Sequence, residues 1–373
     1  MRDTHLLYFG RLSKFITFGD RKMAILLKCN SIFLHVPKTA GNWVADILEK
    51  NDLVFSHFGG KHSNMEQINT FEKWFNLPEQ YYRPKQPFTK FCFVRNPFGW
   101  YESFFKMQRK LNWPKWGVDP AVWHPNAALD GLGSQDFNMF VSNVLKRCPG
   151  YVSNLYGWYL LPRIDFVGRQ ENLAEDMETI LEGLGVSFDR DVLWKTAPVN
   201  KSDDADIHWE PDIREEVAYT EFSVFKQFGY EYLLPWNSGK EMISAYSVDR
   251  REYGIYGEGE TYIPKSYTYN ASKIETLQAP FIHEAGYAWK ISLPKYESIA
   301  DDEELGKAHR SKMIMFEDGQ PLWQRHIYHE EIRRLGEGRY SHWKSNLFFS
   351  TTDNSDPNTN GRIYQIVFLE KEE

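Results

Sequence analysis

The sequence predicts an α/β fold, in which a P-loop-like parallel sheet flanked by helices is followed by a smaller β-rich C-terminal module. Up to about residue 235, short apolar runs alternate with stretches of helical periodicity, a pattern typical of α/β domains. Beyond about residue 240, short runs are separated mainly by turn residues. We therefore expect a first domain over residues 28–236 and a second over 240–373, and a length of 373 residues allows both.

Three apolar runs predict the strands of the sheet, namely SIFLHV (31–36), KFCFV (90–94) and IDFVG (164–168). They are rich in aromatic and β-branched residues and are flanked by helix-breaking or polar residues. Continuous apolar runs of this length are typical of strands that are buried on both faces of a parallel sheet.

Helical patterns follow or separate these runs. In NWVADILEKN (42–51), Val44, Ile47 and Leu48 share one face, and ENLAEDMETILEGLG (171–185) carries a longer apolar stripe that ends at Gly185. In the C-terminal module, only RHIYHEEIRRLG (325–336) has a helical pattern.

The remaining features of the module favour structure over chemistry. Glu317-Asp318-Gly319-Gln320 predicts a hairpin turn, and its many aromatic residues suit a core better than a sugar-stacking surface. DPNTNG (356–361) resembles the start of a calcium loop, but Val367 stands at the twelfth position, so we predict a turn. His326 and His329 could share a helical face, but no third metal ligand is evident.

Composition excludes several classes of protein. A net charge of −7 argues against a nucleic-acid partner, and no segment has the roughly 18 consecutive apolar residues of a membrane span. The three cysteines are far apart and odd in number, and the N-terminus lacks a signal-peptide centre. We therefore expect a cytoplasmic protein, in which the glycosylation motifs at Asn200 and Asn270 are chance matches.

The end of the first predicted strand suggests an anion site. There HVPKTAG (35–41) places small residues and Lys38 between a strand and a helix. Backbone N–H groups of such a turn, the helix dipole and a lysine together favour a phosphate. The nucleotide-triphosphate motif G-x-x-x-x-G-K-[ST] is absent. The alternative is a plain strand–helix turn with an incidental lysine.

The second predicted strand ends in the same way. FCFVRNPFGWYESFFKM (91–107) runs from an apolar strand through a Pro-Gly turn into a helix. Arg95 lies at the carboxyl end of the strand, where open parallel sheets bind ligands, and Ser103 follows on the first turns of the helix. An arginine and a hydroxyl at a second strand end suit a ligand with two separate phosphate groups.

These two motifs, in this order, resemble the sulfotransferase superfamily, in particular its carbohydrate-type, heparan 2-O-like branch. The resemblance covers about residues 30–235 and includes DFVGRQENLAEDMETILEGLGV (165–186), PVNKS (198–202) and EFSVFKQFGYEY (221–232). It implies that the first motif binds the 5′-phosphosulfate of 3′-phosphoadenylyl sulfate (PAPS) and that the second binds the 3′-phosphate. The cofactor-binding residues it implies are Lys38, Thr39, Ala40, Gly41, Asn42, Trp43, Arg95 and Ser103.

One position departs from the family pattern. The family has a second arginine in the 3′-phosphate motif, and this sequence has Trp100 there. The contact is then lost or supplied elsewhere, and Lys201 in the VNKS loop is our candidate.

The resemblance also implies a mechanism without a metal, in which Lys38 stabilises charge on the leaving phosphate. A base must take the proton of the acceptor hydroxyl. The segment SHFGGKHSNMEQI (56–68) resembles the heparan 2-O-type histidine motif at His62, with His57 and Glu66 as the next candidates. The alternative for His62 is a surface histidine. We expect His35 to be a buried structural residue.

The function we predict is sulfuryl transfer from PAPS to a hydroxyl group of a carbohydrate or small-metabolite acceptor. The alternatives are a nucleotide-dependent phosphotransferase and a catalytically inactive sulfotransferase-fold binding protein. Net acidity disfavours a highly anionic polysaccharide acceptor. The oligomeric state stays open, with a homo-oligomer among the options.

Overall fold

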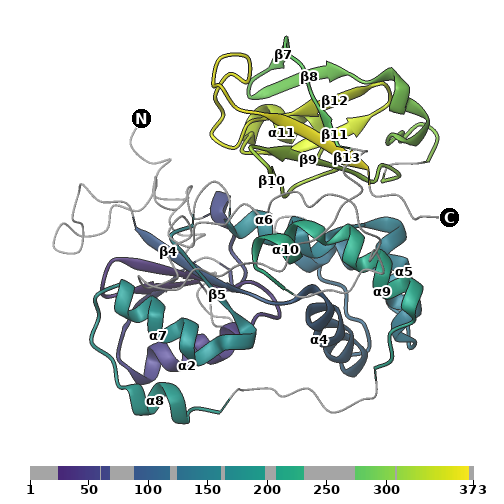
Figure 1. Cartoon of the computed structure of the whole chain (residues 1–373). Helices are drawn as coiled ribbons and strands as arrows, with labels where there is room; N and C mark the ends of the chain where they lie inside the picture. Colours follow the sequence, from purple (N-terminus) through teal and green to yellow (C-terminus); the bar gives the residue numbers. More distant parts are fainter. Residues whose placement is uncertain are drawn as a thin grey trace, which may run out of the picture.

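The computed structural model describes residues 24–58, 60–67, 88–117, 124–160, 164–197, 207–230, 274–306 and 309–368. The described residues up to 230 form an α/β part, and those from 274 onward form a β-rich part (Figure 1). Lys201, Asn200, Asn270 and the predicted boundary near residues 236–240 lie outside the described residues. Within the described residues, no helix is both long and apolar enough to cross a membrane.

The first sheet is mixed, although the sequence predicted a parallel one. Its strands are β1 (Ala24–Leu27), β2 (Ser31–Leu34), β3 (Val54–Phe58), β4 (Thr89–Val94) and β5 (Phe166–Arg169), in the order β3-β1-β2-β4-β5. The three predicted strands, β2, β4 and β5, are parallel neighbours as expected. β1 is antiparallel to β2 and β3, because a short turn at residues 28–30 makes β1 and β2 a hairpin. β1 also lies before residue 28, where we had placed the start of the domain.

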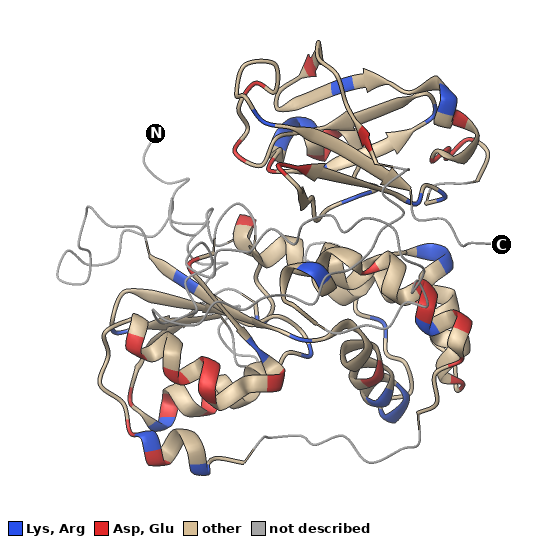
Figure 2. Cartoon of the chain, viewed as in Figure 1, with Lys and Arg blue, Asp and Glu red and all other residues tan. Residues whose placement is uncertain are grey.

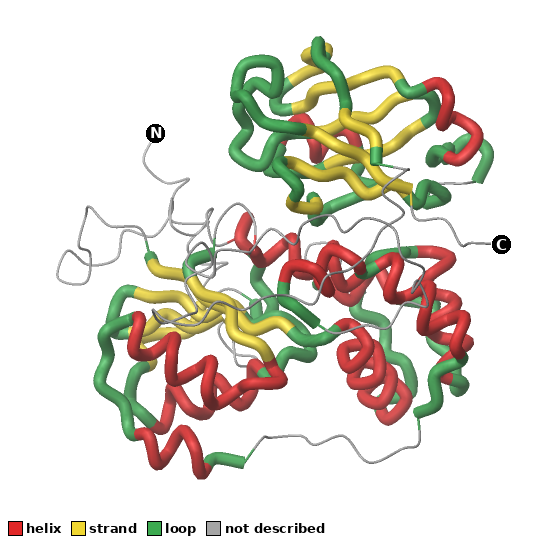
Figure 3. The backbone as a smooth tube through the Cα atoms, in the orientation of Figure 1, coloured by secondary structure: helices red, strands yellow, loops and turns green. Residues whose placement is uncertain are grey.

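Helices cover both faces of this sheet (Figure 3). On one face lie α2 (Gly41–Lys50), α7 (Leu173–Gly183) and α8 (Arg190–Lys195), which pack on Phe33 and its neighbours. On the other face lie α4 (Pro97–Lys110), α5 (Phe137–Arg147), α6 (Tyr151–Leu160), α9 (Pro211–Thr220) and α10 (Phe222–Gln227). Short 3₁₀ turns occur at Pro125–Leu129 and Gln170–Asn172.

The β-rich part contains two antiparallel four-stranded sheets. One has the order β10-β9-β13-β6 and the other β11-β12-β8-β7. Their strands are β6 (Glu275–Thr276), β7 (Ile282–Ala285), β8 (Ala288–Ser292), β9 (Met313–Glu317), β10 (Gln320–Pro321), β11 (Tyr340–Trp343), β12 (Asn346–Phe349) and β13 (Tyr364–Phe368). The 3₁₀ turn Pro294–Ile299 and α11 (His329–Leu335) complete it.

The hairpin predicted at residues 317–320 is confirmed. Asp318 and Gly319, between β9 and β10, both have positive φ, of 49° and 76°, as a two-residue hairpin turn of this kind requires. The DPNTNG segment forms a turn in which the side chain of Asn358 bonds the backbone of Phe281.

The predicted helix over 325–336 is wrong in extent, because α11 begins only at His329. His326 lies before it, with a φ of 57°, and its ring contacts Asp301, whereas the ring of His329 stacks on Phe348. The two histidines therefore do not share a helical face.

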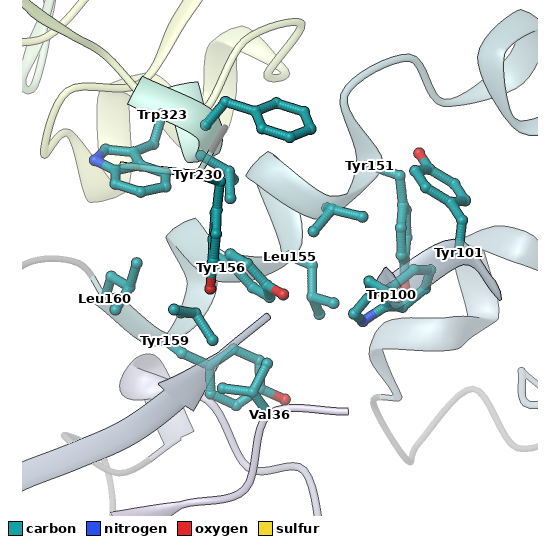
Figure 4. Close-up of a cluster of buried hydrophobic side chains, with 14 of the residues drawn as sticks. Val36, Trp100, Tyr101, Tyr151, Leu155, Tyr156, Tyr159, Leu160, Tyr230 and Trp323 are labelled. Carbon is teal, nitrogen blue, oxygen red and sulfur yellow. The ribbon is translucent and has the colours of Figure 1, made fainter. Parts of the chain in front are cut away.

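Strand β9 joins the two parts through its alternating side chains. Met313 and Met315 pack in the core between the two β-sheets, whereas Ile314 and Phe316 belong to the same hydrophobic cluster as α6 and α10. A strand that is buried on both faces reads as a continuous apolar run, as MIMF does. Trp323, beyond β10, lies above Tyr230 and Leu160 in the same cluster (Figure 4).

Candidate active site

The turn after β2 presents backbone N–H groups at the carboxyl edge of the sheet. Lys38 and Ala40 adopt the left-handed conformation, with φ of 67° and 66°, and α2 begins at Gly41. Thr39 is buried and its hydroxyl donates to the carbonyl of Val36 at 3.0 Å. Within the described residues, no group accepts a well-formed hydrogen bond from the N–H groups of residues 38–42. Successive unpaired N–H groups of this kind form an anion-binding concavity.

Gly41 is required by its neighbour His35. A Cβ atom at Gly41 would collide with the imidazole of His35, which lies directly over this residue. His35 is buried, as predicted, at the end of β2. Two predicted cofactor residues have side chains directed elsewhere: the Thr39 hydroxyl bonds within the turn, and Trp43 donates from its indole to the Thr196 carbonyl at 3.0 Å.

The side chain of Trp100 contacts the backbone of the turn at residues 37–40. Its side chain is fully buried, and its indole N–H donates to the carbonyl of Pro37 at 2.9 Å. Its ring also stacks on Phe104, with centroids 5.0 Å apart. A residue held in this way cannot replace an arginine as an anion contact, but it fixes the carbonyl next to Lys38.

The side chain of Arg95, in the second motif (91–107), contacts the turn of the first motif (35–41). Its Nη1 donates to the carbonyl of Lys38 at 3.4 Å, and its Nε would lie 3.0 Å from a Cβ on Gly99, so the guanidinium lies across the first turn of α4. Ser103 is four residues beyond Gly99 and therefore on the same helical face. The hydroxyl of Tyr156 secures the backbone of Arg95, because it accepts from Arg95 N at 2.9 Å and donates to Arg95 O at 2.8 Å.

Lys38 lies in a cationic and partly buried environment. Burial, then the charges of Arg95 and Lys61, lower the pKa of Lys38 from 10.5 to about 8. Figure 2 shows that the charge is uneven along the helices of the α/β part, and the charged residues of α7 are all acidic. With a net charge of −7, an anion site depends on local cations such as Lys38, Arg95 and Lys61.

His62 is held in one tautomer. Its Nδ1 lies 2.8 Å from the carbonyl oxygen of His35, which can only accept, so Nδ1 carries the proton and Nε2 carries the lone pair. The hydroxyl of Tyr159 donates to the backbone carbonyl of His62 at 2.7 Å. Burial is the main cause that lowers the pKa of His62 from 6.5 to about 3, and the charges of Lys61 and Lys38 add to it. The imidazole is therefore neutral at physiological pH.

A row of aromatic rings extends from His62. His35 and His124 each lie edge-on to His62, with ring centroids 5.0 and 5.2 Å away. Trp116 stacks on His124 at 4.6 Å, with 10° between the ring planes. The Trp116 backbone N–H donates to the carboxylate of Asp130 at 3.0 Å, which anchors this end of the row.

The other two candidate bases lie in different surroundings. His57 is on β3, and its Nε2 lies 4.0 Å from Glu49 near the C-terminal end of α2, whereas the anion turn is at the N-terminal end. Glu66 is exposed and forms an ion pair with Arg334 of α11 at 2.7 Å. The charge of Lys38 helps to lower the pKa of His62, which places these two groups near each other.

Sequence reasoning did not identify Trp100, Tyr156 and Tyr159 as supports of the site. The two tyrosines occur one helical turn apart in YVSNLYGWYL, and an i, i+3 pair of aromatic residues was the available signal. Their partners, however, are 61 and 97 residues away in the sequence.

No metal-binding group is evident at this edge: among the residues that the structure describes, no three His, Cys, Asp or Glu side chains are arranged to hold a metal ion. No protein-family model matches the chain, and comparisons with curated proteins and with solved structures gave no match.

Proposed function

We propose that this protein is a sulfotransferase that moves a sulfuryl group from PAPS to a hydroxyl group of a carbohydrate or a small metabolite. The observation that carries the proposal is the convergence of two motifs at the ends of neighbouring parallel strands, where Arg95 reaches the carbonyl of Lys38 at 3.4 Å. N–H groups that have no partner among the described residues, together with Lys38 and Arg95, suit a ligand with two anionic groups.

In the proposed reaction, the acceptor oxygen attacks the sulfur of PAPS and the bond from sulfur to the phosphate oxygen breaks. The acceptor proton passes to Nε2 of His62, and Lys38 stabilises the charge that develops on the leaving phosphate. The bound phosphosulfate adds negative charge near His62, and this raises the pKa of its imidazole above the value of the free protein.

The acceptor would lie beside the row of rings at His62. Trp116 and His124 stack on each other next to the base, and aromatic rings in such a position suit an acceptor with a ring. We place the reaction in the cytoplasm, and the three free cysteines support this assignment.

Ligand-dependent thermal stability tests the cofactor. We expect PAP, the desulfated product, to raise the melting temperature without magnesium, because a ligand that binds only the folded state stabilises it by mass action. Arg95→Ala should weaken PAP by about tenfold or more through loss of a charge-assisted contact. Arg109→Ala is the matched control, because Arg109 is an exposed arginine in the last turn of α4, where its guanidinium lies over the ring of Phe105. A preference for ATP with Mg²⁺ over PAP would instead support the phosphotransferase.

One observation favours the second candidate, an inactive sulfotransferase-fold binding protein. Trp100 occupies the position of the family's second arginine and is buried with its N–H on Pro37, so one phosphate contact is missing within the described residues. PAP binding without PAP formation from PAPS, across a panel of hydroxyl acceptors, would support this candidate.

A further inference from the structure

Helix α6 supports the candidate site with two tyrosine hydroxyls. Tyr156 bonds both the N–H and the carbonyl of Arg95, and Tyr159 donates to the carbonyl of His62 at 2.7 Å. Both tyrosines are fully buried, and Figure 4 shows them on the same stretch of the helix. The positions of Arg95 and His62 therefore depend on the position of α6.

The other side of α6 contacts the β-rich part. Gly157 faces Gln324, and a Cβ atom at Gly157 would lie 2.6 Å from Cγ of Gln324 and 2.9 Å from its Cδ. Gln324 is completely buried, and its side-chain amide donates to the carbonyl of Asn154 at 3.4 Å. Asn154 and Gly157 are three residues apart, as are Tyr156 and Tyr159, so each pair occupies one face of the helix.

The beginning of α6 is held in place independently. The buried carboxylate of Glu221 accepts from Val152 N at 3.0 Å and from Ser153 N at 2.7 Å. A push at Gly157 therefore cannot slide the whole helix, and it would displace the half that carries Tyr156 and Tyr159.

We propose that α6 couples the β-rich part to the candidate site, with Gly157 and Gln324 as positioning residues. Gln324 sets how closely α6 approaches the β-rich part, and the two tyrosines transmit this position to Arg95 and His62. The effect on PAP affinity rests on the proposed function, whereas the effect on the His62 ring does not. Displacements of about 1 Å at reacting groups reduce rates by up to about 10²-fold, so even a small shift is measurable.

Gly157→Ala in the full-length chain tests the coupling. The added methyl group collides with Gln324, and we expect PAP affinity to fall roughly tenfold and the ¹⁵N signals of the His62 ring to shift. The signals are assigned by comparison with His62→Gln. In Gly157→Ala/Gln324→Ala the methyl group has room, so both readouts should return toward those of the unaltered protein.

The matched control is Gly183→Ala. Gly183 is also a helical glycine in close contact, because a Cβ atom there would lie 2.7 Å from the ring of Phe166, but it belongs to α7. We expect this variant to lose stability without a change in PAP affinity or in the His62 signals.

The inference is overturned if Gly157→Ala loses only stability, as the control does, or if Gln324→Ala fails to restore the two readouts. If Gly157→Ala alone does not fold, Gln324→Ala is compared with the double variant. The methyl group at position 157 fills part of the space that Gln324→Ala leaves, so PAP affinity and the His62 signals of the double variant should be closer to those of the unaltered protein. A native chain that binds no PAP contradicts the proposed function, and the His62 signals still test the coupling.

Discussion

Two groups of histidines in this molecule have opposite electrostatic surroundings. The candidate site holds His35, His62 and His124, and a second group in the β-rich part, here called the histidine cluster, consists of His309, His326, His342, Asp301 and Ser311. In the site, Nδ1 of His62 donates to a neutral carbonyl and the nearest charges are cationic. In the cluster, Nδ1 of His326 donates to the carboxylate of Asp301 at 2.6 Å.

The histidine cluster contains its own anion, the carboxylate of Asp301. Asp301 is buried and also accepts from Ser311 N at 2.7 Å, while the Ser311 hydroxyl bonds Nδ1 of His342 at 2.7 Å. Burial lowers the pKa of a histidine in both groups, to about 3 for His62 and to about 4 for His342. A lowered pKa therefore does not by itself mark a functional site. The charges that act on the titratable group distinguish the two: the cations Lys38 and Lys61 act on His62, whereas the carboxylate of Asp301 binds His326.

The largest expected effect concerns the base. His62→Ala should leave PAP affinity within about twofold and reduce turnover by roughly 10²–10⁴-fold, because the imidazole acts on the acceptor and not on the cofactor. His326→Gln, in the cluster, should leave turnover nearly unchanged. Steady-state formation of PAP from PAPS measures both. An active His62→Ala combined with an inactive Glu66→Gln would identify Glu66 as the base.

The second expected effect concerns Lys38 and pH. Lys38→Ala should reduce turnover by roughly 10²–10³-fold, as removal of a charge-stabilising donor does elsewhere. Since the pKa of Lys38 is about 8 in the free protein, kcat/KM should fall about tenfold per pH unit above this value as the ammonium loses its proton. A pH profile of kcat/KM measures the position of this alkaline limb.

Lys38→Arg is the control for this limb, because a guanidinium keeps its charge far above pH 8 and should abolish the limb at a lower maximal rate. An unchanged limb in this variant would assign the titration to another group. On the acid side, a base histidine with the reference pKa of 6.5 would make kcat/KM fall near that pH. Because kcat/KM reports the free protein, in which the pKa of His62 is about 3, we expect no such fall in kcat/KM between pH 5 and 7.

The cluster should respond in stability instead. Asp301→Asn removes the charged acceptor of Ser311 N and His326 Nδ1, and we expect a loss of about 2–4 kcal/mol in the free energy of unfolding. PAP affinity should stay within about twofold. Urea unfolding and PAP titration on the same variant measure the two quantities, with Asp302→Asn as the neighbouring control. A change in PAP affinity larger than the change in stability would mean that the cluster belongs to the site.

Local sequence patterns were sufficient to predict part of the fold. The parallel strands β2, β4 and β5, the turn at Lys38 and the hairpin at residues 318–319 follow from local patterns of apolar runs and turn residues. The strand β1 was missed because its pairing depends on a hairpin turn at residues 28–30 that has no Gly or Pro.

The residues that support the site, Trp100, Tyr156 and Tyr159, were missed for another reason: their hydrogen-bond partners are far away in the sequence. Trp100 looked like a lost arginine, but it bonds Pro37, 63 residues away. The sequence predicted the hairpin turn after the apolar run MIMF, but it does not say that one face of β9 packs with α6 and α10. Local patterns predict elements and their ends, whereas the packing partners of a buried side chain require the three-dimensional structure.

The smallest expected effect concerns the ion pair of Glu66 and Arg334, which links the His62 segment to α11. The two side chains approach to 2.7 Å but remain 50% and 54% exposed, so solvent screens the pair and its coupling should stay below about 1 kcal/mol. A double-mutant cycle of Glu66→Gln and Arg334→Gln, read in free energy of unfolding and in turnover, measures this coupling. We expect each single variant to keep nearly full turnover, because His62 is held by Tyr159 and by the His35 carbonyl and not by this pair. A coupling above about 2 kcal/mol, or a loss of turnover in Arg334→Gln, would mean that the β-rich part acts on the site through its surface as well as through α6.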